Sequence, residues 1–359
     1  ARHTADAEPT ALRVELSNPG NRFVGRSFLD LDITGSSAWG DEVHLLWREG
    51  LNGLNGAGND SRYHEPSIAW NRVTNYGVIG AGIHYTNFDF VFNGIPLHGD
   101  LRQVEALWLY PLYADFTHHW LFELKGDRTD KKNETEADIG TPGTAGFIAA
   151  GTKEQEEVYT SVEVTNTWSQ KLHLLKDDSS FDAALTVRRG LSSEHQPVTP
   201  ANLDYLLYRP ALALKQPFGE RFNVSASING QFSTDVLPEQ QEWLLGGLGS
   251  MTAYLPGVAI GDVGYSARAQ AEFNLDVAHF ELVPRAFFEY GYATFQNPSA
   301  GETSQRQTLS DVGAELAFKW GKLFEGSVAW AAPVDHSGIA QSELDAQRAN
   351  VYFRIAAKL

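Results

Sequence analysis

A stretch in which every second residue is apolar, from Tyr265 to Leu275, limits what this chain can fold into. Because successive side chains of a β-strand point to opposite faces of a sheet, such a strand has one apolar face and one polar face. A globular protein packs the apolar face against its core. A membrane barrel presents that face to lipid and keeps the polar face in a water-filled lumen. The apolar positions are Tyr265, Ala267, Ala269, Ala271, Phe273 and Leu275, and the polar positions between them are Ser266, Arg268, Gln270, Glu272 and Asn274.

The same alternation recurs along the chain in about 16 segments, which we expect to be strands. No segment has the pattern of a helix of typical length. Short connections tend to alternate with long ones, and the number of strands is even, as in outer-membrane barrels. Clear examples are the segments 12–16, 104–112, 158–164, 183–187, 224–228, 280–292, 312–320 and 351–359.

Charged residues stand in the middle of the expected strands, on the polar face. A closed soluble core would bury such charges at a cost of several kcal/mol each, whereas a large water-filled lumen would not. A soluble sandwich could expose them on its outer face, but it would have to pair about 16 apolar faces and carry loops that are unusually long for a compact domain. We therefore expect an all-β fold, a transmembrane antiparallel β-barrel. The charged residues are Arg268, Glu272, Glu281, Arg285, Glu289, Glu315, Lys319 and Arg354.

Three segments are expected to be loops between these strands. Gly50–Asp60 is rich in Gly and Asn, and Phe88–Asp100 follows an expected strand. Asp127–Glu157 is long, charged and rich in Gly and Thr, a composition that is typical of mobile connections.

Composition narrows the class and the partners of the chain. Its 359 residues carry a formal net charge of −17, which argues against nucleic acid as a partner. No run of about 18 or more apolar residues exists, so we expect no transmembrane helix; a barrel strand needs only about 9–11 residues, of which alternate ones are apolar. Without cysteine the chain has no disulfide. Aromatic residues make up 12% of the chain, which suits the aromatic girdles of an outer-membrane barrel.

The region from Gln231 to Gly291 carries a series of short motifs rich in Gly, aromatic and acidic residues. They are Gln231-Phe232-Ser233, Leu237, Glu242-Trp243, Gly246-Gly247, Ser250-Met251-Thr252-Ala253-Tyr254, Gly261-Asp262-Val263-Gly264-Tyr265 and Phe287-Phe288-Glu289-Tyr290-Gly291. In order and spacing these motifs resemble those of the two-partner secretion transporters, the haemolysin-activator or filamentous-haemagglutinin transporter type. That family belongs to the superfamily that includes the barrel-assembly protein of the outer membrane. The general layout is similar from Leu12 to Leu359, although only this region is rich in motifs.

The resemblance implies a barrel of about 16 antiparallel strands in the bacterial outer membrane, with a long sixth external loop, about 234–263, folded into the lumen. In the family an Arg of this loop reaches an acidic residue of the inner wall through a charge-assisted hydrogen bond. The resemblance also implies that the chain moves an unfolded partner polypeptide to the cell surface without a nucleotide. The expected partners are that polypeptide and the lipid and lipopolysaccharide of the outer membrane, and we expect a monomer.

Two departures from the family pattern concern the contact between the loop and the wall. Thr252 stands where the family has the loop Arg, and Ala253 where it has the following Gly. Glu289 stands where the family has the wall Asp. Thr cannot make the bidentate pair that Arg makes, so the contact is either absent or rebuilt. Glu289 could instead pair with Arg285 or Arg268, or bind Thr252 weakly.

The candidate site residues fall into two groups, and neither group is catalytic. The histidines are scattered, and no Ser/His/acid set or Gly-x-Ser-x-Gly elbow is recognisable. We therefore expect no enzyme, no metal site and no cofactor. The loop group is Gly246, Gly247, Thr252, Tyr254, Gly261, Asp262 and Gly264, and the lumen-wall group is Arg268, Glu272, Arg285, Phe287, Glu289 and Gly291.

The expected organisation is a short linker or leader remnant at 1–10 followed by one barrel at 11–359. The periplasmic POTRA domains that recruit the partner in this family have no counterpart in the sequence. The expected function is an outer-membrane pore that secretes a partner polypeptide. The alternatives are a passive or ligand-specific channel on the same barrel, and a soluble all-β binding module.

Overall fold

The computed structural model describes most of the chain, and the description below is confined to that part. It covers residues 10–20, 25–37, 39–51, 62–92, 95–140, 142, 144, 147–175, 177–193, 201–296, 306–349 and 351–359. The expected linker at 1–10 lies outside these residues except for its last position, and so does nearly all of the expected loop Gly50–Asp60.

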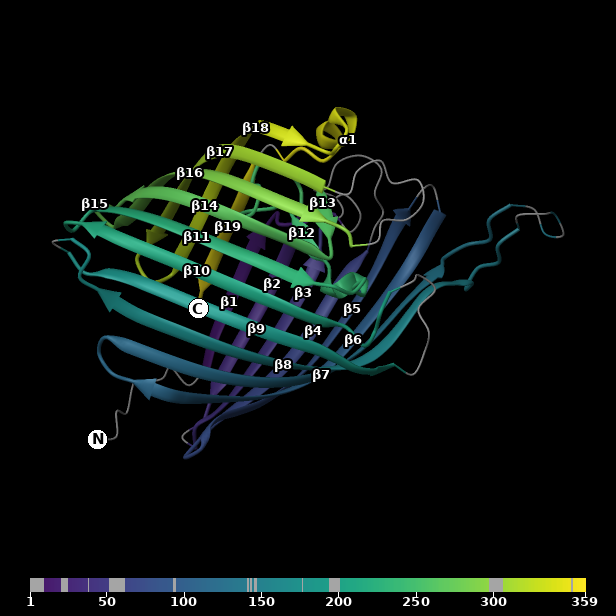
Figure 1. Ribbon diagram of the computed structural model, residues 1–359, viewed down its shortest axis with the longest axis horizontal. Coiled ribbons are helices and arrows are strands. Elements are labelled where there is room, and N and C mark those ends of the chain that lie inside the picture. The colour runs from purple at the N-terminus through teal and green to yellow at the C-terminus, as the bar shows by residue number, and fades with distance from the viewer. Residues whose placement is uncertain are drawn as a thin grey trace.

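The described chain is built almost entirely from strands that follow one another around a barrel (Figure 1). The wall strands are β1 (Thr10–Ser17), β2 (Phe28–Ser36), β3 (Asp41–Gly50), β4 (Tyr63–Thr74), β5 (Gly77–Phe92), β6 (Ile95–Ala114), β7 (His118–Thr135), β8 (Lys153–Leu172), β9 (Ser179–Ser193), β10 (Leu206–Phe218), β11 (Phe222–Ser233), β14 (Val263–Phe273), β15 (Leu275–Val277), β16 (Phe280–Thr294), β17 (Arg306–Trp320), β18 (Phe324–Ser337) and β19 (Tyr352–Lys358).

Each wall strand pairs antiparallel with its neighbours, and the first strand pairs with the last, so that the sheet closes. The strands β14 and β15 are separated only by Asn274 and both pair with β16, so they act as one strand of the wall. The wall is therefore a closed barrel of 16 antiparallel strands, which confirms the expected fold class.

Apolar side chains cover the outside of the barrel, as the alternation predicts. On β2 and β3 the exposed large side chains are those of Leu31, Ile33, Val43, Leu45 and Trp47, at every second position. The same alternation holds around the wall, and the residues between them face inward. No helix of the described residues is long and apolar enough to cross a membrane.

Connections at the two ends of the barrel differ in length. At one end, the short-turn end, β2 and β3, β4 and β5, and the later pairs are joined by two to six residues. At the other end, the long-loop end, the longest connection is 234–262, between β11 and β14. It is the sixth connection at this end, as the resemblance implies.

The prediction of a loop is wrong for much of two segments. Within Phe88–Asp100 the strand β5 continues to Phe92 and β6 begins at Ile95. Within Asp127–Glu157 the strands β7 and β8 continue to Thr135 and from Lys153, so only 136–152 connects them. The β7–β8 hairpin reaches furthest beyond the barrel, at the right of Figure 1. The extended parts of these strands are held by hydrogen bonds between backbone groups. Such bonds form without an alternation of apolar and polar side chains, so the sequence pattern did not indicate strands there.

Candidate functional site

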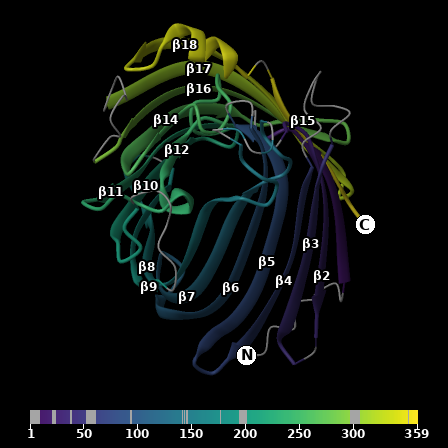
Figure 2. The same cartoon turned by 90° about the vertical axis from the view of Figure 1, so that its right-hand side faces the viewer.

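The connection 234–262 turns back into the barrel instead of extending away from it. It contains a short 3-10 helix, η2 (Glu239–Gln241), and two short strands, β12 (Trp243–Leu245) and β13 (Ala259–Gly261), which pair antiparallel. Seen from the long-loop end, β12 lies inside the ring of wall strands (Figure 2). Buried side chains of the loop, among them Leu245, Met251 and Tyr254, pack against Phe287 and Leu309 of the wall. The loop thus forms a packed layer within the lumen.

A tight turn at the tip of this loop depends on two of the predicted glycines. Gly246 and Gly247 have φ angles of 106° and 89°, which L side chains rarely adopt. The Gly246 amide donates to the Ser250 carbonyl over 2.7 Å. A Cβ at Gly246 would also lie 2.1 Å from the carbonyl oxygen of Leu255. Only glycine therefore fits at Gly246.

The tip contacts the wall through two successive backbone amides. The Thr252 amide donates to Glu289 Oε2 over 2.6 Å. The Ala253 amide donates to Asp311 Oδ2 over 2.7 Å. Met251 has a φ of 70°, and a left-handed residue next to successive amides is typical of the concave backbone sites that bind anions. We call these two amides and two carboxylates the loop latch.

The positive charge at the loop latch comes from the wall. Arg268 of β14 lies directly opposite Glu289 of β16 and donates to its Oε1 over 2.5 Å. The Arg268 guanidinium also lies over the Phe287 ring, 3.9 Å from its centre. Of the arrangements left open by the sequence, Arg268 is the partner of Glu289, and the Thr252 side chain is not. Arg285 binds Glu272 and Glu315 instead.

Sequence reasoning missed Asp311 as a member of the site. Asp311 of β17 lies directly opposite Glu289, and both side chains are 0% exposed. One oxygen of Asp311 accepts from Ala253, and the other has no hydrogen-bond partner within the described residues. The two acids lie side by side because of the register in which β16 pairs with β17. This register cannot be read from the length of the connection between the two strands.

Asp262 holds the base of the loop together and ties it to the next connection. Its Oδ1 accepts from the Leu237 amide over 2.8 Å, and its Oδ2 accepts from the Gln296 amide over 2.9 Å. Gln231 donates to the Gln241 carbonyl over 2.7 Å. Asp262 therefore joins the start of the loop, its end and the next connection at one point.

Three of the predicted glycines lie where the loop touches the wall most closely. A Cβ at Gly264 would lie 2.1 Å from the Trp243 ring. A Cβ at Gly261 would lie 2.4 Å from the Thr294 carbonyl oxygen, and one at Gly291 would lie 3.0 Å from the Leu245 side chain. Because these glycines have no side chain, the loop can pack directly against the backbone of the wall.

The last connection of the chain covers the tip of the loop. The Leu255 amide donates to the Gln347 carbonyl over 2.8 Å, and the Ala349 amide donates to the Ala253 carbonyl over 2.9 Å. The Tyr352 hydroxyl donates to the Tyr254 carbonyl over 2.7 Å. This connection carries the one-turn helix α1 (Gln341–Ala346), whose Leu344 is part of the same buried cluster as Tyr254. The two connections are thus held together by backbone pairing.

The loop base also holds an acidic side chain with an unusual proton affinity. Glu242 follows η2 and lies close to Glu239 and Asp262. Burial and the negative charges of these neighbours raise the pKa of Glu242 to about 8. Near neutral pH this side chain therefore carries its proton for most of the time.

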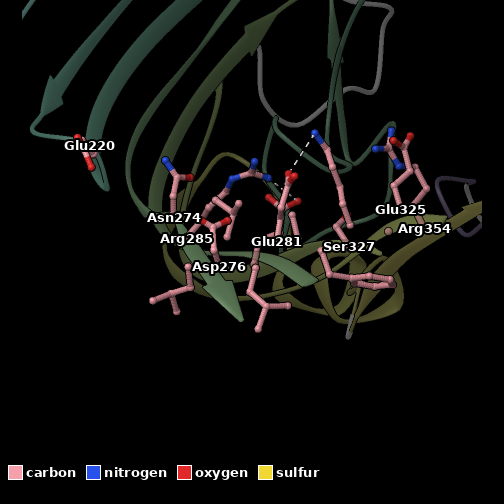
Figure 3. A pocket seen from close by; sticks show the side chains of 16 residues that line it. Glu220, Asn274, Asp276, Glu281, Arg285, Glu325, Ser327 and Arg354 are labelled. Carbon is pink, nitrogen blue, oxygen red and sulfur yellow. Dashed lines mark hydrogen bonds and ion pairs between the residues drawn. The ribbon is translucent and has the colours of Figure 1, made fainter. Parts of the chain in front are cut away.

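A polar chamber of about 530 Å³ lies inside the barrel at the short-turn end (Figure 3). Arg285 bridges Glu272 and Glu315, at 3.3 and 3.1 Å. Glu325 and Arg354 lie at one side of the chamber and Glu220 at the other. The charged residues that line this space are five acidic ones and three basic ones, so acidic side chains are in the majority. They are Glu220, Asp276, Glu281, Glu315 and Glu325, and Arg285, Lys319 and Arg354.

The predicted site residues therefore occupy three places. The tip group is Gly246, Gly247, Thr252 and Tyr254: the two glycines form the turn, Thr252 binds Glu289, and Tyr254 belongs to the same buried cluster as Phe287. Of the wall group, Arg268 binds Glu289, and Gly291 lies under Leu245 of the loop. The base group is Gly261, Asp262 and Gly264. Arg285 lines the chamber and Glu272 pairs with it, and the hydrogen-bond partners of both are wall residues rather than residues of the loop tip. In the part of the chain that the structure describes, no three His, Asp or Glu side chains are placed to hold a metal ion.

Comparisons with known proteins define the kind of barrel. No family model and no curated protein sequence matches the chain. The structure is similar to CdiB from Escherichia coli, with a TM-score of 0.78 and 14% identity over 98% of this chain and 63% of that one. It is also similar to CdiB from Acinetobacter baumannii, with a TM-score of 0.69 and 14% identity over 98% of this chain and 60% of that one.

A third similar structure is BamA from Haemophilus ducreyi lacking POTRA domains 1–3, with a TM-score of 0.63 and 12% identity over 98% of this chain and 70% of that one. At such identities the likeness concerns the fold. The chain has a barrel of the CdiB and BamA type, as the sequence resemblance implies. It spans less than two thirds of the length of the CdiB chains.

Proposed function

We propose that this barrel is a translocation pore of the bacterial outer membrane that passes a partner polypeptide to the cell surface. Its fold is that of CdiB, a two-partner secretion transporter. Its outer face is apolar around the wall, as lipid requires. Its long-loop end then faces the cell exterior, because outer-membrane barrels carry their long loops there.

The observation that carries this proposal is the loop held inside the lumen. A structural loop of 29 residues could extend into solvent, but this one is buried against the wall at both its tip and its base. Its tip is held by hydrogen bonds and by apolar packing, and by no covalent bond to the wall, so it can be released without breaking covalent structure. A polar lumen then contacts an extended chain weakly enough to let it pass.

Single-channel recording in planar bilayers tests whether the loop closes the pore. The intact refolded chain is compared with a chain that lacks Gly246–Gly261 and with Glu281→Ala, a substitution at the exposed chamber mouth, as control. We expect low or flickering conductance from the intact chain and the control, and steady conductance from the deletion. Equal conductance in all three would mean that the loop does not close the pore.

Secretion itself is tested in the source organism. Deletion of the gene should remove a large polypeptide from the surface proteome, and a plasmid copy should restore it. An unchanged surface proteome would contradict the secretion proposal while leaving the barrel and its membrane location intact. The monomeric state and the lack of enzymatic activity remain predictions of the same proposal.

The second candidate function is a passive or ligand-specific channel on the same barrel. The observation that favours it is that the loop latch uses no side chain of the loop, in contrast to the Arg that the family places there. A stable open conductance that replacement of Glu289 does not change would support this channel. The remaining alternative, a soluble binding module, predicts that salt alone extracts the chain from membranes.

A further inference from the structure

A hollow interrupts the apolar outer surface of the barrel at β10, β11 and β14, which lie side by side toward the viewer in Figure 1. Its volume is about 240 Å³. That is smaller than the roughly 300–1,000 Å³ of pockets that enclose whole small molecules, so it suits a part of an elongated ligand. It is lined by Pro210, Leu212, Ile228, Gly230, Phe232 and Tyr265.

The hollow has a local cause in the sequence. The pairing of β10 with β11 is regular at Tyr208 with Phe232 and again at Ala211 with Asn229, but not between them, where Pro210 faces Gly230. Proline has no amide hydrogen for the ladder, and glycine has no side chain to fill the surface. Leu212, Ile228 and Phe232 point outward around the gap, each more than 40% exposed.

The hollow lies at the level at which a membrane interface is expected. Tyr265 stacks on Tyr292 with ring centres 5.5 Å apart, and aromatic residues at this height are typical of the girdle at the membrane surface. Arg189 of β9 lies opposite Leu206, four residues from Pro210 toward the long-loop end, which is about 13 Å along the strand. Its side chain is 62% exposed and pairs at 3.4 Å with the equally exposed Asp204.

An Arg on the outer face just beyond an aromatic girdle matches the phosphate of a lipid head group, because guanidinium binds phosphate with paired hydrogen bonds. Its ion pair with Asp204 is exposed and therefore weak, so a phosphate can replace it. We propose that the hollow binds one acyl chain of a phosphate-bearing lipid of the outer leaflet, whose head group is bound by Arg189. The proposal rests on the membrane location proposed above.

Photolabelling in defined vesicles tests this site. The intact chain is inserted into vesicles of phosphatidylethanolamine and phosphatidylglycerol that contain a phosphatidylglycerol with a diazirine midway along one acyl chain. After illumination, labelled peptides are quantified by mass spectrometry. We expect about five times more label on β10, β11 and β14 than on β2 and β3, whose outer face has no such hollow.

Two variants fill the hollow, Gly230→Phe and the smaller Gly230→Leu. The matched control is Gly35→Phe on β2, because a Cβ at Gly35 would meet no other atom within 4 Å. Filling should lower the label on β10, β11 and β14 to the level of β2 and β3, and the control should not. Arg189→Gln should lower labelling by this probe about threefold, but should not change labelling by an uncharged diacylglycerol that carries the same diazirine chain.

Label spread evenly around the barrel, or unchanged in both filled variants, would overturn the lipid site and leave the pore untouched. Equal loss of both probes in Arg189→Gln would overturn the head-group assignment. Insertion is measured first, by protection of the wall strands from protease. A chain that does not insert would overturn the membrane location on which both proposals depend.

Discussion

At the residue scale, the loop latch shows how buried carboxylates are kept without a loop Arg. Glu289 divides its two oxygens between the Thr252 amide and Arg268. A buried carboxylate without such partners would be strongly unfavourable. The importance of Glu289 for the loop could be predicted from the sequence, but that of Asp311 could not, because its place opposite Glu289 depends on the register between β16 and β17.

The first prediction concerns removal of the Glu289 carboxylate. Glu289→Ala leaves a buried amide and a buried guanidinium without their acceptor, and each such group costs about 1–3 kcal/mol. We expect the loop to open more often and protease to cleave it within 246–257 roughly thirtyfold faster, since about 2 kcal/mol corresponds to that factor. Glu281→Ala, at an exposed ion pair, is the control. Equal cleavage rates would make Glu289 an ordinary charge of the lumen.

The second prediction is a pH dependence of loop attachment that arises from Glu242. The pKa of Glu242 is raised from 4.5 to about 8 in the attached loop, so attachment takes up a proton between these values. Attachment should therefore weaken as pH rises from about 4.5 to about 8 and change little above that. Amide exchange of the loop measured from pH 5 to pH 9 should show this slope, after correction for intrinsic exchange.

Glu242→Gln should flatten that slope, because the amide side chain is neutral throughout. Glu220→Gln, at the exposed chamber wall, should keep it. A slope that persists in Glu242→Gln would assign the pH dependence to other groups near the loop base, namely Glu239, Asp262, Lys131 and Glu157.

At the scale of elements, alternation predicted the strands within the barrel wall, where one face points outward and the other into the lumen, but not where the strands extend beyond the wall. In β7 the segment Lys131–Thr135 is polar on both faces, and its pairing with β8 satisfies the backbone. Such a segment has the composition of a loop and the hydrogen bonds of a strand. The pairing of the loop tip with the last connection is likewise made by backbone groups, which leave no signal in a sequence.

The third prediction uses this pairing and the lack of cysteine in the chain. Tyr254 and Arg348 form an isolated antiparallel bridge, and the hydrogen bonds lie on the residues that flank them. Residues in such a non-hydrogen-bonded pair have Cα atoms about 4.5 Å apart, within the range that a disulfide spans. The double variant Tyr254→Cys/Arg348→Cys should form a disulfide on oxidation and suppress the flickering conductance, and reductant should restore it.

Each single cysteine variant serves as a control for the loss of the native side chain. If the oxidised double variant conducts as often as the reduced one, the loop opens without separating from the last connection. Failure of the disulfide to form would show that the two connections are not paired in the membrane.

At the scale of the whole molecule, the barrel has an apolar outer surface and a polar inner surface. On each strand of the wall, alternate residues belong to one surface or the other. Neighbouring residues on one strand therefore face the outside of the barrel and its lumen in turn. The bulk composition, with a mean hydropathy of −0.29, averages over this difference and hides it. The alternation of apolar and polar residues along each strand reveals this difference, which is why the fold class could be predicted from the sequence.

The fourth prediction compares two neighbours on β4. Ile68 is 46% exposed on the outer face, and Ser67 points into the lumen. Ile68→Arg should destabilise the barrel in bilayers by about 2–4 kcal/mol, as expected for a charge on the lipid face near the midplane, and Ser67→Arg by much less. Denaturant titration of the refolded chains in vesicles measures the difference. Equal destabilisation would argue against lipid around this wall.

The loop latch has a consequence for how freely its parts can vary. The loop contributes only its main chain to the contact, whereas the wall contributes the carboxylates of Glu289 and Asp311. Small replacements such as Thr252→Ser or Thr252→Ala should therefore be tolerated, because the contact uses the Thr252 amide and the buried position limits mainly the size of the side chain. Replacement of either acid should be penalised whatever its size. A mutational scan would find the two halves of one contact under different constraints, side-chain size at Thr252 and the carboxylate itself at Glu289 and Asp311.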